Sequence, residues 1–125
     1  MKILVVDDEP DIQPLFQQRF RKEIRNGEIV FEFAYSGEQA LERMENYIHE
    51  AVLILSDINM PGMSGLELLE QIKDKNHTPP PVVMMITAYG DEENHRRAMD
   101  LGADDFLTKP VDFVLLKEKI KSLGV

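Results

Sequence analysis

Carboxylate, hydroxyl and ammonium side chains stand at the ends of four short apolar segments of this chain. They are Asp7, Asp8, Asp57, Thr87 and Lys109. Strands of a parallel sheet are buried on both faces, so they are continuous runs of apolar residues, and these segments have that form. If the segments are parallel strands, the five side chains meet at one end of one sheet.

Three carboxylates gathered in one place repel one another. At about 5 Å separation and an effective dielectric constant near 20, each pair repels by roughly 3 kcal/mol, so the cluster needs a compensating cation. Oxygen ligands, without cysteine or a suitable histidine pair, favour Mg²⁺, with Mn²⁺ as a substitute. An aspartate at a strand end beside such a metal can attack phosphorus, and Asp57 occupies that position. Thr87 and Lys109 would then contact the phosphoryl oxygens.

Each of these residues also has a purely structural interpretation. Asp7 and Asp8 would serve equally as charges at the start of a helix. A buried Thr87 would satisfy the backbone, and Lys109 would form a surface ion pair worth at most about 1 kcal/mol. The joint spacing of these residues favours the chemical interpretation.

The elements that must position these residues can be predicted from the same sequence. Strands are expected over 3–6, 29–34, 52–56, 82–86 and 105–108. Four of the helices are expected to begin at residues whose side chains accept hydrogen bonds from first-turn amides. These capping residues are Ser36, Ser64, Asp91 and Asp112.

The remaining helix is the first one, which is expected over 11–25 with a distorted first turn at Pro14. Its apolar positions recur at helical spacing and are expected to face the core. They are Ile12, Leu15, Phe16, Phe20 and Ile24.

Five strands that alternate with five helices predict an α/β fold with right-handed crossovers. We expect an open, doubly wound, flavodoxin-like parallel sheet with strand order 2-1-3-4-5. In such sheets ligands bind beyond the carboxyl ends of the strands, where the strand order reverses. No linker, repeat or low-complexity tract divides the chain, so residues 1–125 are expected to form a single domain.

Composition limits the partners that this chain can have. The net charge of -9 argues against direct nucleic-acid binding, which depends on Lys and Arg. The chain has no cysteine and no run of about 18 apolar residues, so neither a disulfide framework nor a membrane span is expected, and the cytoplasm is the expected location. His49, His77 and His95 are too far apart for a metal site and are expected on the surface.

Taken together, the motifs resemble the response-regulator receiver domain of two-component signalling, from Met1 to about Leu123. The matching segments are Val5–Pro10, Asp57–Gly65, Thr87–Ala88 and Gly102–Pro110. The resemblance implies that Asp7, Asp8 and Asp57 hold Mg²⁺ together with the backbone carbonyl of Asn59. It also implies a cis peptide bond between Lys109 and Pro110, and it assigns to Asn59 and Tyr89 an influence on the phosphoryl lifetime.

The resemblance further implies a signalling switch that acts only on its own phosphorylation state. Asp57 would accept a phosphoryl group from a sensor histidine kinase or a histidine phosphotransfer protein and later lose it to water. Phe106 matches the switch aromatic, which moves into space vacated by Thr87; ordinary core packing is its alternative role. The fourth helix, fifth strand and fifth helix would contact an output domain or downstream protein, or a second copy in a homodimer. The first helix and the strand-end loops would dock the kinase.

Three other functions have to be weighed against this one. A phosphatase with an aspartyl nucleophile would need a second aspartate two residues after Asp57, where this chain has Asn59. A flavin-binding module would need a loop rich in Ser, Thr or Gly after the first strand, where the acidic Asp7 and Asp8 would repel a phosphate. A receiver that only scaffolds partners would be expected to lack one of the site residues.

Overall fold

The computed structural model describes residues 1–47, 51–74, 81–88 and 90–123. In these ranges five strands form one parallel sheet in the order β2-β1-β3-β4-β5, as the sequence predicts. The strands are β1 (Lys2–Val6), β2 (Val30–Ala34), β3 (Ala51–Asp57), β4 (Val82–Thr87) and β5 (Asp105–Thr108).

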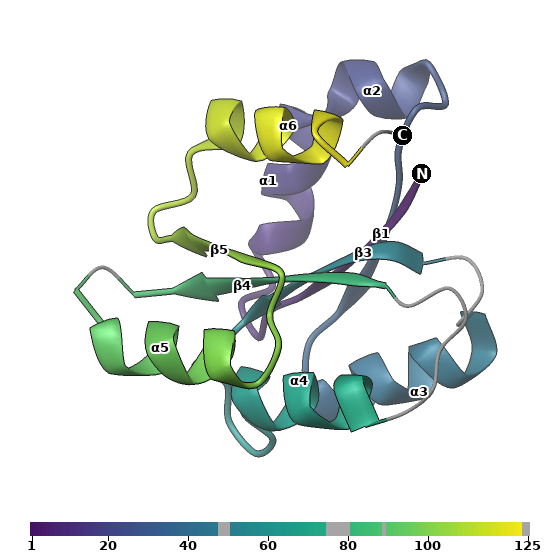
Figure 1. Ribbon diagram of the computed structural model, residues 1–125. Helices are drawn as coiled ribbons and strands as arrows, with labels where there is room; N and C mark the ends of the chain where they lie inside the picture. The colour runs from purple at the N-terminus through teal and green to yellow at the C-terminus, as the bar shows by residue number, and fades with distance from the viewer. Residues whose placement is uncertain (48–50, 75–80, 89, 124–125) are drawn as a thin grey trace.

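Helices cover both faces of this sheet (Figure 1). One face carries α1 (Ile12–Arg19), α2 (Arg21–Arg25) and α6 (Phe113–Lys121). The other carries α3 (Gly37–Tyr47), α4 (Gly65–Asp74) and α5 (Glu92–Asp100). None of the helices in the described ranges has the length and apolar composition that crossing a bilayer requires.

The hydrophobic core consists of two layers, one on each face of the sheet. Successive side chains of a strand point to opposite faces. Leu4 and Val6 of β1 therefore pack beneath α3, α4 and α5, whereas Ile3 and Val5 pack beneath α1 and α6. Burial on both sides explains why the three central strands β1, β3 and β4 contain continuous apolar runs, whereas the edge strands β2 and β5 are only partly buried.

The four expected helix caps are confirmed. Asp91 accepts a hydrogen bond from the Asn94 amide, and Asp112 accepts from the amides of Val114 and Leu115. The hydroxyl groups of Ser36 and Ser64 accept hydrogen bonds from the amides three residues further on, at 3.0 and 3.2 Å. These side chains begin α5, α6, α3 and α4 and satisfy amides that would otherwise lack partners.

The first helix is not continuous, contrary to the prediction. Phe20 separates α1 from α2 with φ -108° and ψ 21°, outside the helical region. Its ring is fully buried and lies edge-on to Phe31, with 5.1 Å between ring centroids. After this change of direction Ile24 is 38% exposed, and Leu15 is 37% exposed, so these two predicted core positions lie at the surface.

Pro14 does not distort the helix as expected. The helix begins at Ile12, so Pro14 lies in the first turn, where a backbone amide has no intrahelical acceptor to lose. Asp11 precedes the helix without a side-chain capping bond.

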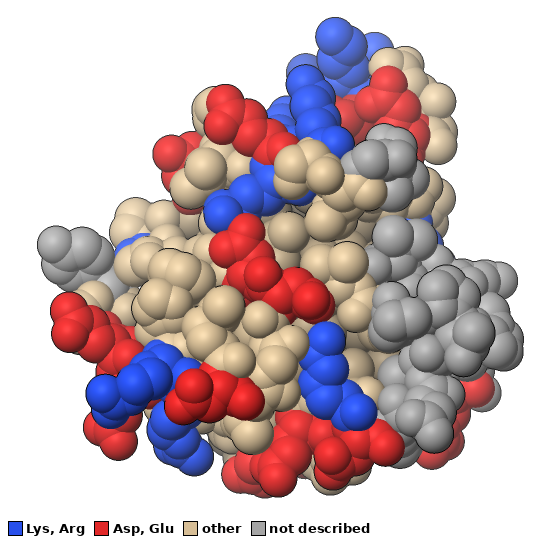
Figure 2. All heavy atoms as spheres, viewed as in Figure 1, with Lys and Arg blue, Asp and Glu red and all other residues tan. Residues whose placement is uncertain are grey.

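Charge is divided unequally between the two helical layers. The sequences of α1, α2 and α6 contain seven Lys or Arg and two Glu. Those of α3, α4 and α5 contain nine Asp or Glu and four Lys or Arg. Figure 2 shows basic side chains gathered at the α2 end of the molecule and acidic side chains along the edge formed by α4. A chain of net charge -9 thus has one basic layer.

Gly65, the first residue of α4, lies against the backbone of Asp57. Its amide donates a hydrogen bond of 2.8 Å to the carbonyl of Ile58. A Cβ atom on Gly65 would lie 2.0 Å from the carbonyl oxygen of Asp57, a backbone atom that cannot rotate away. Only glycine allows the start of α4 to approach the end of β3 so closely.

We predict that Gly65→Ala lowers the free energy of unfolding by about 3 kcal/mol or more, because the clash forces backbone to move. Urea unfolding followed by circular dichroism measures this change. Gly37→Ala is the matched control, since Gly37 begins α3 and its added Cβ would meet the flexible side chain of Met63. Equal effects of the two substitutions would refute the special role of Gly65.

Candidate functional site

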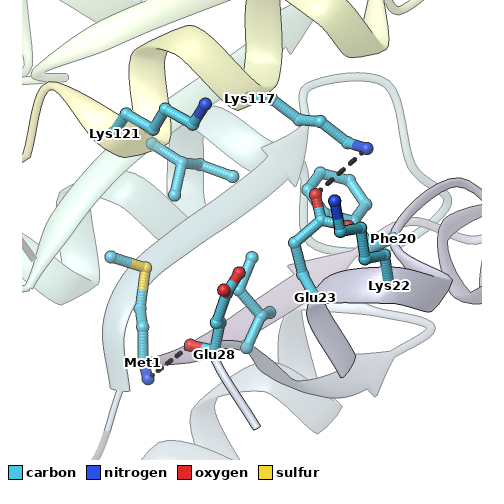
Figure 3. Close-up of a pocket in the computed structure, with 9 residues that line it drawn as sticks. Met1, Phe20, Lys22, Glu23, Glu28, Lys117 and Lys121 are labelled. Carbon is cyan, nitrogen blue, oxygen red and sulfur yellow. Dashed lines mark hydrogen bonds and ion pairs between the residues drawn. The ribbon is translucent and has the colours of Figure 1, made fainter. Parts of the chain in front are cut away.

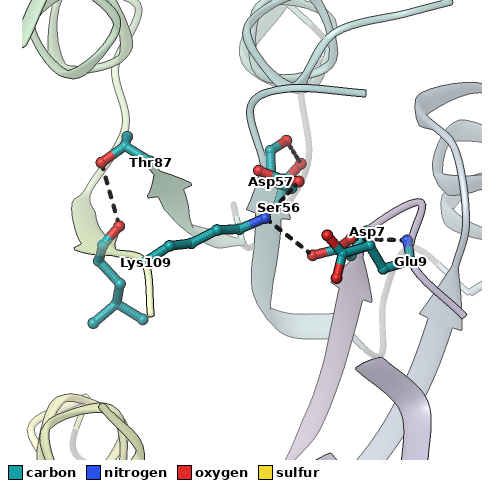
Figure 4. Close-up of polar contacts among 7 residues, drawn as sticks. Asp7, Glu9, Ser56, Asp57, Thr87 and Lys109 are labelled. Carbon is teal, nitrogen blue, oxygen red and sulfur yellow. Dashed lines mark hydrogen bonds and ion pairs between the residues drawn. The ribbon is translucent and has the colours of Figure 1, made fainter. Parts of the chain in front are cut away.

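Four strands deliver polar residues to the same edge of the sheet. Asp7 follows β1 directly, Asp57 ends β3, Thr87 ends β4, and Lys109 follows β5. Backbone hydrogen bonds continue beyond the last strand: the Lys109 amide donates to the Thr87 carbonyl at 2.8 Å. The residues predicted to meet at the carboxyl ends of parallel strands therefore do so (Figure 4).

The acidic residues form a compact cluster. Asp7, Asp8 and Asp57 each place a carboxylate oxygen within 4.8 Å of the others. Asp7 and Asp57 are only 1% and 3% exposed, whereas Asp8 is half-buried and lies on the solvent side. Three oxygen donors at this spacing fit a hard divalent cation such as Mg²⁺, which keeps part of its water shell.

Lys109 is the cation that contacts this cluster. Its Nζ lies 3.0 Å from Asp57 Oδ2 and 3.9 Å from Asp7 Oδ2. Burial by itself would lower the pKa of Lys109, but the hydrogen bond and charge of Asp57, with smaller contributions from Asp7 and Glu9, raise it above its ordinary value. Lys109 is therefore charged at neutral pH.

A single ammonium group does not balance three carboxylates. Burial raises the pKa of Asp7, and the negative charge of Asp57 raises it further. The Glu9 amide opposes this shift by donating a 3.0 Å hydrogen bond to Asp7 Oδ1, as does the charge of Lys109. Ionised Asp7 therefore costs folding free energy until a further cation is bound.

Thr87 is turned away from the acidic cluster and toward β5. Its side chain is buried, and its hydroxyl donates a long hydrogen bond of 3.4 Å to the carbonyl of Leu107 (Figure 4). At 3.4 Å the contact is near the limit of a hydrogen bond, so its loss costs little.

Phe106 is half-buried on β5 and lies beneath the ring of His95 from α5. The two ring centroids are 3.5 Å apart. His95 is half-buried, which agrees with the expected surface position, and its ring also packs on Phe106. His49 and His77 lie outside the described residues, as does Tyr89.

Two further expectations concern the loop after β3 and the bond after Lys109. Asn59 is exposed in the loop that follows Asp57, next to the acidic cluster in sequence. The peptide bond between Lys109 and Pro110 is cis, as the resemblance implied.

Sequence reasoning found no role for Asp104 and Asp105, although both have partners. Asp104 Oδ2 accepts a 2.8 Å hydrogen bond from the Val83 amide and pairs with Lys73 at 3.3 Å. Asp105 Oδ2 pairs with Lys119 of α6 at 2.6 Å. These aspartates fasten the start of β5 to β4 and α6. In the sequence, the position of both aspartates at the start of a short apolar run is the signal that could have indicated this role.

Fold and site together define an open parallel α/β domain with an acidic, lysine-containing centre at its carboxyl edge. The sequence matches the response regulator receiver domain family over residues 3–121. The chain belongs to this family.

The chain is similar to proteins of this family in sequence and in structure. It is 35% identical over 123 residues to response regulator RppA of Synechocystis sp., covering 98% of this chain and 50% of RppA. A response regulator receiver domain protein from Clostridium thermocellum has 30% identity and a TM-score of 0.84, with 97% of this chain and 91% of that chain covered. The chain thus spans half the length of RppA.

A third similarity involves a complex. A chain from the co-crystal structure of the Saccharomyces cerevisiae histidine phosphotransfer signaling protein Ypd1 and the receiver domain of its downstream response regulator Ssk1 matches with a TM-score of 0.82. The identity is 27%, and the match covers 96% of this chain and 86% of that chain.

We predict that Asp7→Asn stabilises the metal-free protein at pH 7 by on the order of 1 kcal/mol, because the neutral amide removes a buried repulsion. Urea unfolding in the presence of a chelator measures the difference. Protonation neutralises wild-type Asp7, so the advantage of asparagine should shrink as the pH falls below the raised pKa of folded Asp7 and vanish once the unfolded aspartate, with its ordinary pKa, is protonated as well.

Asp8→Asn serves as the control for this substitution. Asp8 is half-buried and better solvated, so the same change of charge should have a smaller effect. Destabilisation by Asp7→Asn at pH 7 would contradict the inferred repulsion.

Proposed function

We propose that this chain is a phosphorylation-dependent signalling switch in which Asp57 accepts a phosphoryl group from a phosphohistidine. The observation that carries this proposal is the position of Asp57, which ends β3 inside the acidic cluster with its Oδ2 3.0 Å from the Lys109 ammonium. A carboxylate held beside a cation at a sheet edge is placed to receive a phosphoryl group.

The transfer forms one bond and breaks another. A carboxylate oxygen of Asp57 bonds to phosphorus while the bond between phosphorus and the histidine nitrogen breaks, and the electron pair returns to that nitrogen. Lys109 stays close to the charge that develops on the oxygens. Later, water attacks the same phosphorus, the bond between phosphorus and the carboxylate oxygen breaks, and inorganic phosphate leaves. The carboxylate is restored, so the chain changes only its own phosphorylation state.

Asp7, Asp8 and Asp57 would hold Mg²⁺, or Mn²⁺ in its place, with the backbone carbonyl of Asn59 as a further ligand. The all-oxygen donor set supports this choice, and so does the raised pKa of Asp7, which is caused mainly by burial and further by the charge of Asp57. Bound metal would supply charge neutralisation for both the carboxylates and the incoming phosphoryl oxygens.

Thr87 and Phe106 would carry the switch. A phosphoryl group brings about -1.5 to -2 charges and three acceptor oxygens, and these compete with the Leu107 carbonyl for the Thr87 hydroxyl. Because the present bond is 3.4 Å long, little is lost when Thr87 turns toward the site. Phe106 can then move into the vacated space, which would change the surface formed by α5, β5 and α6.

The proposed partners follow from this mechanism. A sensor histidine kinase or histidine phosphotransfer protein would dock on α1 and the strand-end loops. The match to a chain of the Ypd1–Ssk1 co-crystal structure supports that class of partner. The surface of α5, β5 and α6 would contact an output domain, a downstream protein or a second copy. The match covers only half of RppA, so RppA has further sequence that could form an output domain, and this supports such a partner for the present domain. We propose that residues 1–125 form one receiver domain, working in the cytoplasm without binding nucleic acid directly.

We predict that a small-molecule phosphodonor with Mg²⁺ adds one acid-labile phosphoryl group to the wild-type chain, and that Asp57→Asn reduces labelling to background. Intact-protein mass spectrometry measures the added mass, and a chelator should prevent its appearance. Asp105→Asn is a control, because Asp105 lies outside the cluster and should keep full labelling. Labelling that persists in Asp57→Asn would place the acceptor elsewhere.

We predict that Lys109→Ala leaves Mg²⁺ binding within about threefold of wild type but removes most of the response of Phe106 to phosphorylation, because the ammonium no longer draws the phosphoryl group toward β5. The chemical shifts of the Phe106 ring report the response. Lys73→Ala, which removes a surface ion pair, should respond normally. A wild-type response in Lys109→Ala would exclude its role in the switch.

A further inference from the structure

A cavity of about 600 Å³ lies between α2, α6 and the beginnings of β1 and β2 (Figure 3). It is at the amino end of the strands, whereas the acidic cluster lies at their carboxyl end. Its lining includes Met1, Phe20, Lys22, Glu23, Glu28, Ile29, Lys117, Ile120 and Lys121. A volume of this size is in the range of small-molecule sites.

The floor of the cavity is apolar. Phe20, Ile29 and Ile120 belong to the core layer beneath α2 and α6, and the side chain of Met1 packs against the same layer. These side chains are fixed by the packing of the core, so the floor is preformed. Phe20 is fully buried, and Ile29 and Ile120 are each 6% exposed, so the apolar surface that a ligand can reach is that of Met1 and the edges of the two isoleucines. An apolar or aromatic body would remove this surface from water on binding.

The rim of the cavity carries more positive than negative charge. Three lysines and two glutamates line it, which leaves a net side-chain charge of +1, and the terminal ammonium group of Met1 adds one more positive charge. Glu23 already has a partner, since its carboxylate lies 3.1 Å from Lys117 Nζ. Among the residues that the structure describes, neither Lys22 nor Lys121 forms an ion pair. Figure 3 shows the Lys121 side chain on the α6 side of the cavity and the Lys22 side chain on the other side, next to Glu23.

The surroundings reinforce this local charge. The cavity opens between α2 and α6, which belong to the basic helical layer. The helices of this layer contain seven Lys or Arg and two Glu, although the chain as a whole carries a charge of -9. Such a local field attracts anions and raises their rate of encounter.

We propose that this cavity is a binding site for a small organic anion with an apolar body, such as an aromatic or aliphatic acid. The acid group would pair with Lys22 and Lys121, and the apolar body would cover Met1 and the exposed edges of Ile29 and Ile120. Inorganic anions lack the body and should bind weakly, and neutral aromatic compounds lack the charge. The site shares no residue with the acidic cluster, so the proposal does not rest on the proposed function.

Titration with anilinonaphthalene sulfonate, an aromatic anion whose fluorescence rises in apolar surroundings, tests the proposal. We expect saturable binding of one molecule per chain to the natively folded protein. Inorganic phosphate and neutral naphthol should each bind at least about tenfold more weakly, because each provides only half of the interaction. Cooperative thermal unfolding of the same sample shows that the probe reports on the folded state.

Two double variants locate the binding. Lys22→Gln with Lys121→Gln should weaken the binding of the probe at least about fivefold, because it removes the two unpaired ammonium groups. Arg21→Gln with Arg25→Gln is the matched control: it removes the same charge from exposed positions of α2 that do not line the cavity. The control should change the dissociation constant less than about twofold.

Amide chemical shifts provide a second, independent readout. On addition of the probe we expect shifts at Glu23, Ile29, Lys117 and Lys121, with little change at Asp57. The proposal is overturned by the absence of saturable binding, by equal weakening in both double variants, or by shifts that map to another surface.

Discussion

The excess of negative charge at the carboxyl edge of the sheet is the constraint on which the rest of this structure depends. Asp7 and Asp57 are almost completely buried, and the Lys109 ammonium is the cation that reaches both. That ammonium is placed by β5, whose last hydrogen bond joins the Lys109 amide to the Thr87 carbonyl. The parallel pairing of β4 and β5 thus brings the balancing charge to residues that are distant in sequence.

The buried carboxylates lower the stability of the metal-free fold, and at the same time they offer oxygen ligands to a cation. Burial and the neighbouring Asp57 raise the pKa of Asp7, so the ionised cluster opposes folding in the absence of a further cation. The close approach of Gly65 to the Asp57 carbonyl limits how far the surrounding backbone can relax. A cluster that cannot relieve its repulsion by moving apart would be stabilised by any cation that enters it.

Much of the fold and the site could be predicted because the signals involved are local. Continuous apolar runs identified the strands, and the side chains of Ser36, Ser64, Asp91 and Asp112 identified four helix starts. The location of the site could then be predicted, because polar residues at the carboxyl ends of parallel strands must lie at the same edge of the sheet. These inferences use only the neighbours of a residue and the direction of the strands.

The features that the sequence did not reveal depend on packing between distant elements. The break at Phe20 accompanies the burial of its ring among aromatic side chains of other elements, and helical periodicity carries no trace of this. The ring of His95 lies over Phe106 only because α5 packs beside β5. The cavity between α2 and α6 likewise exists only once both helices lie on the sheet.

The separation of charge between the two helical layers has a consequence for encounters at a distance. Opposite charge excesses on opposite faces of the sheet give the molecule an electric dipole that runs across it. A dipole turns in the field of a charged surface before any side chains touch. The molecule would therefore meet a strongly acidic or a strongly basic partner in different orientations, and its overall negative charge alone does not describe how it approaches either one.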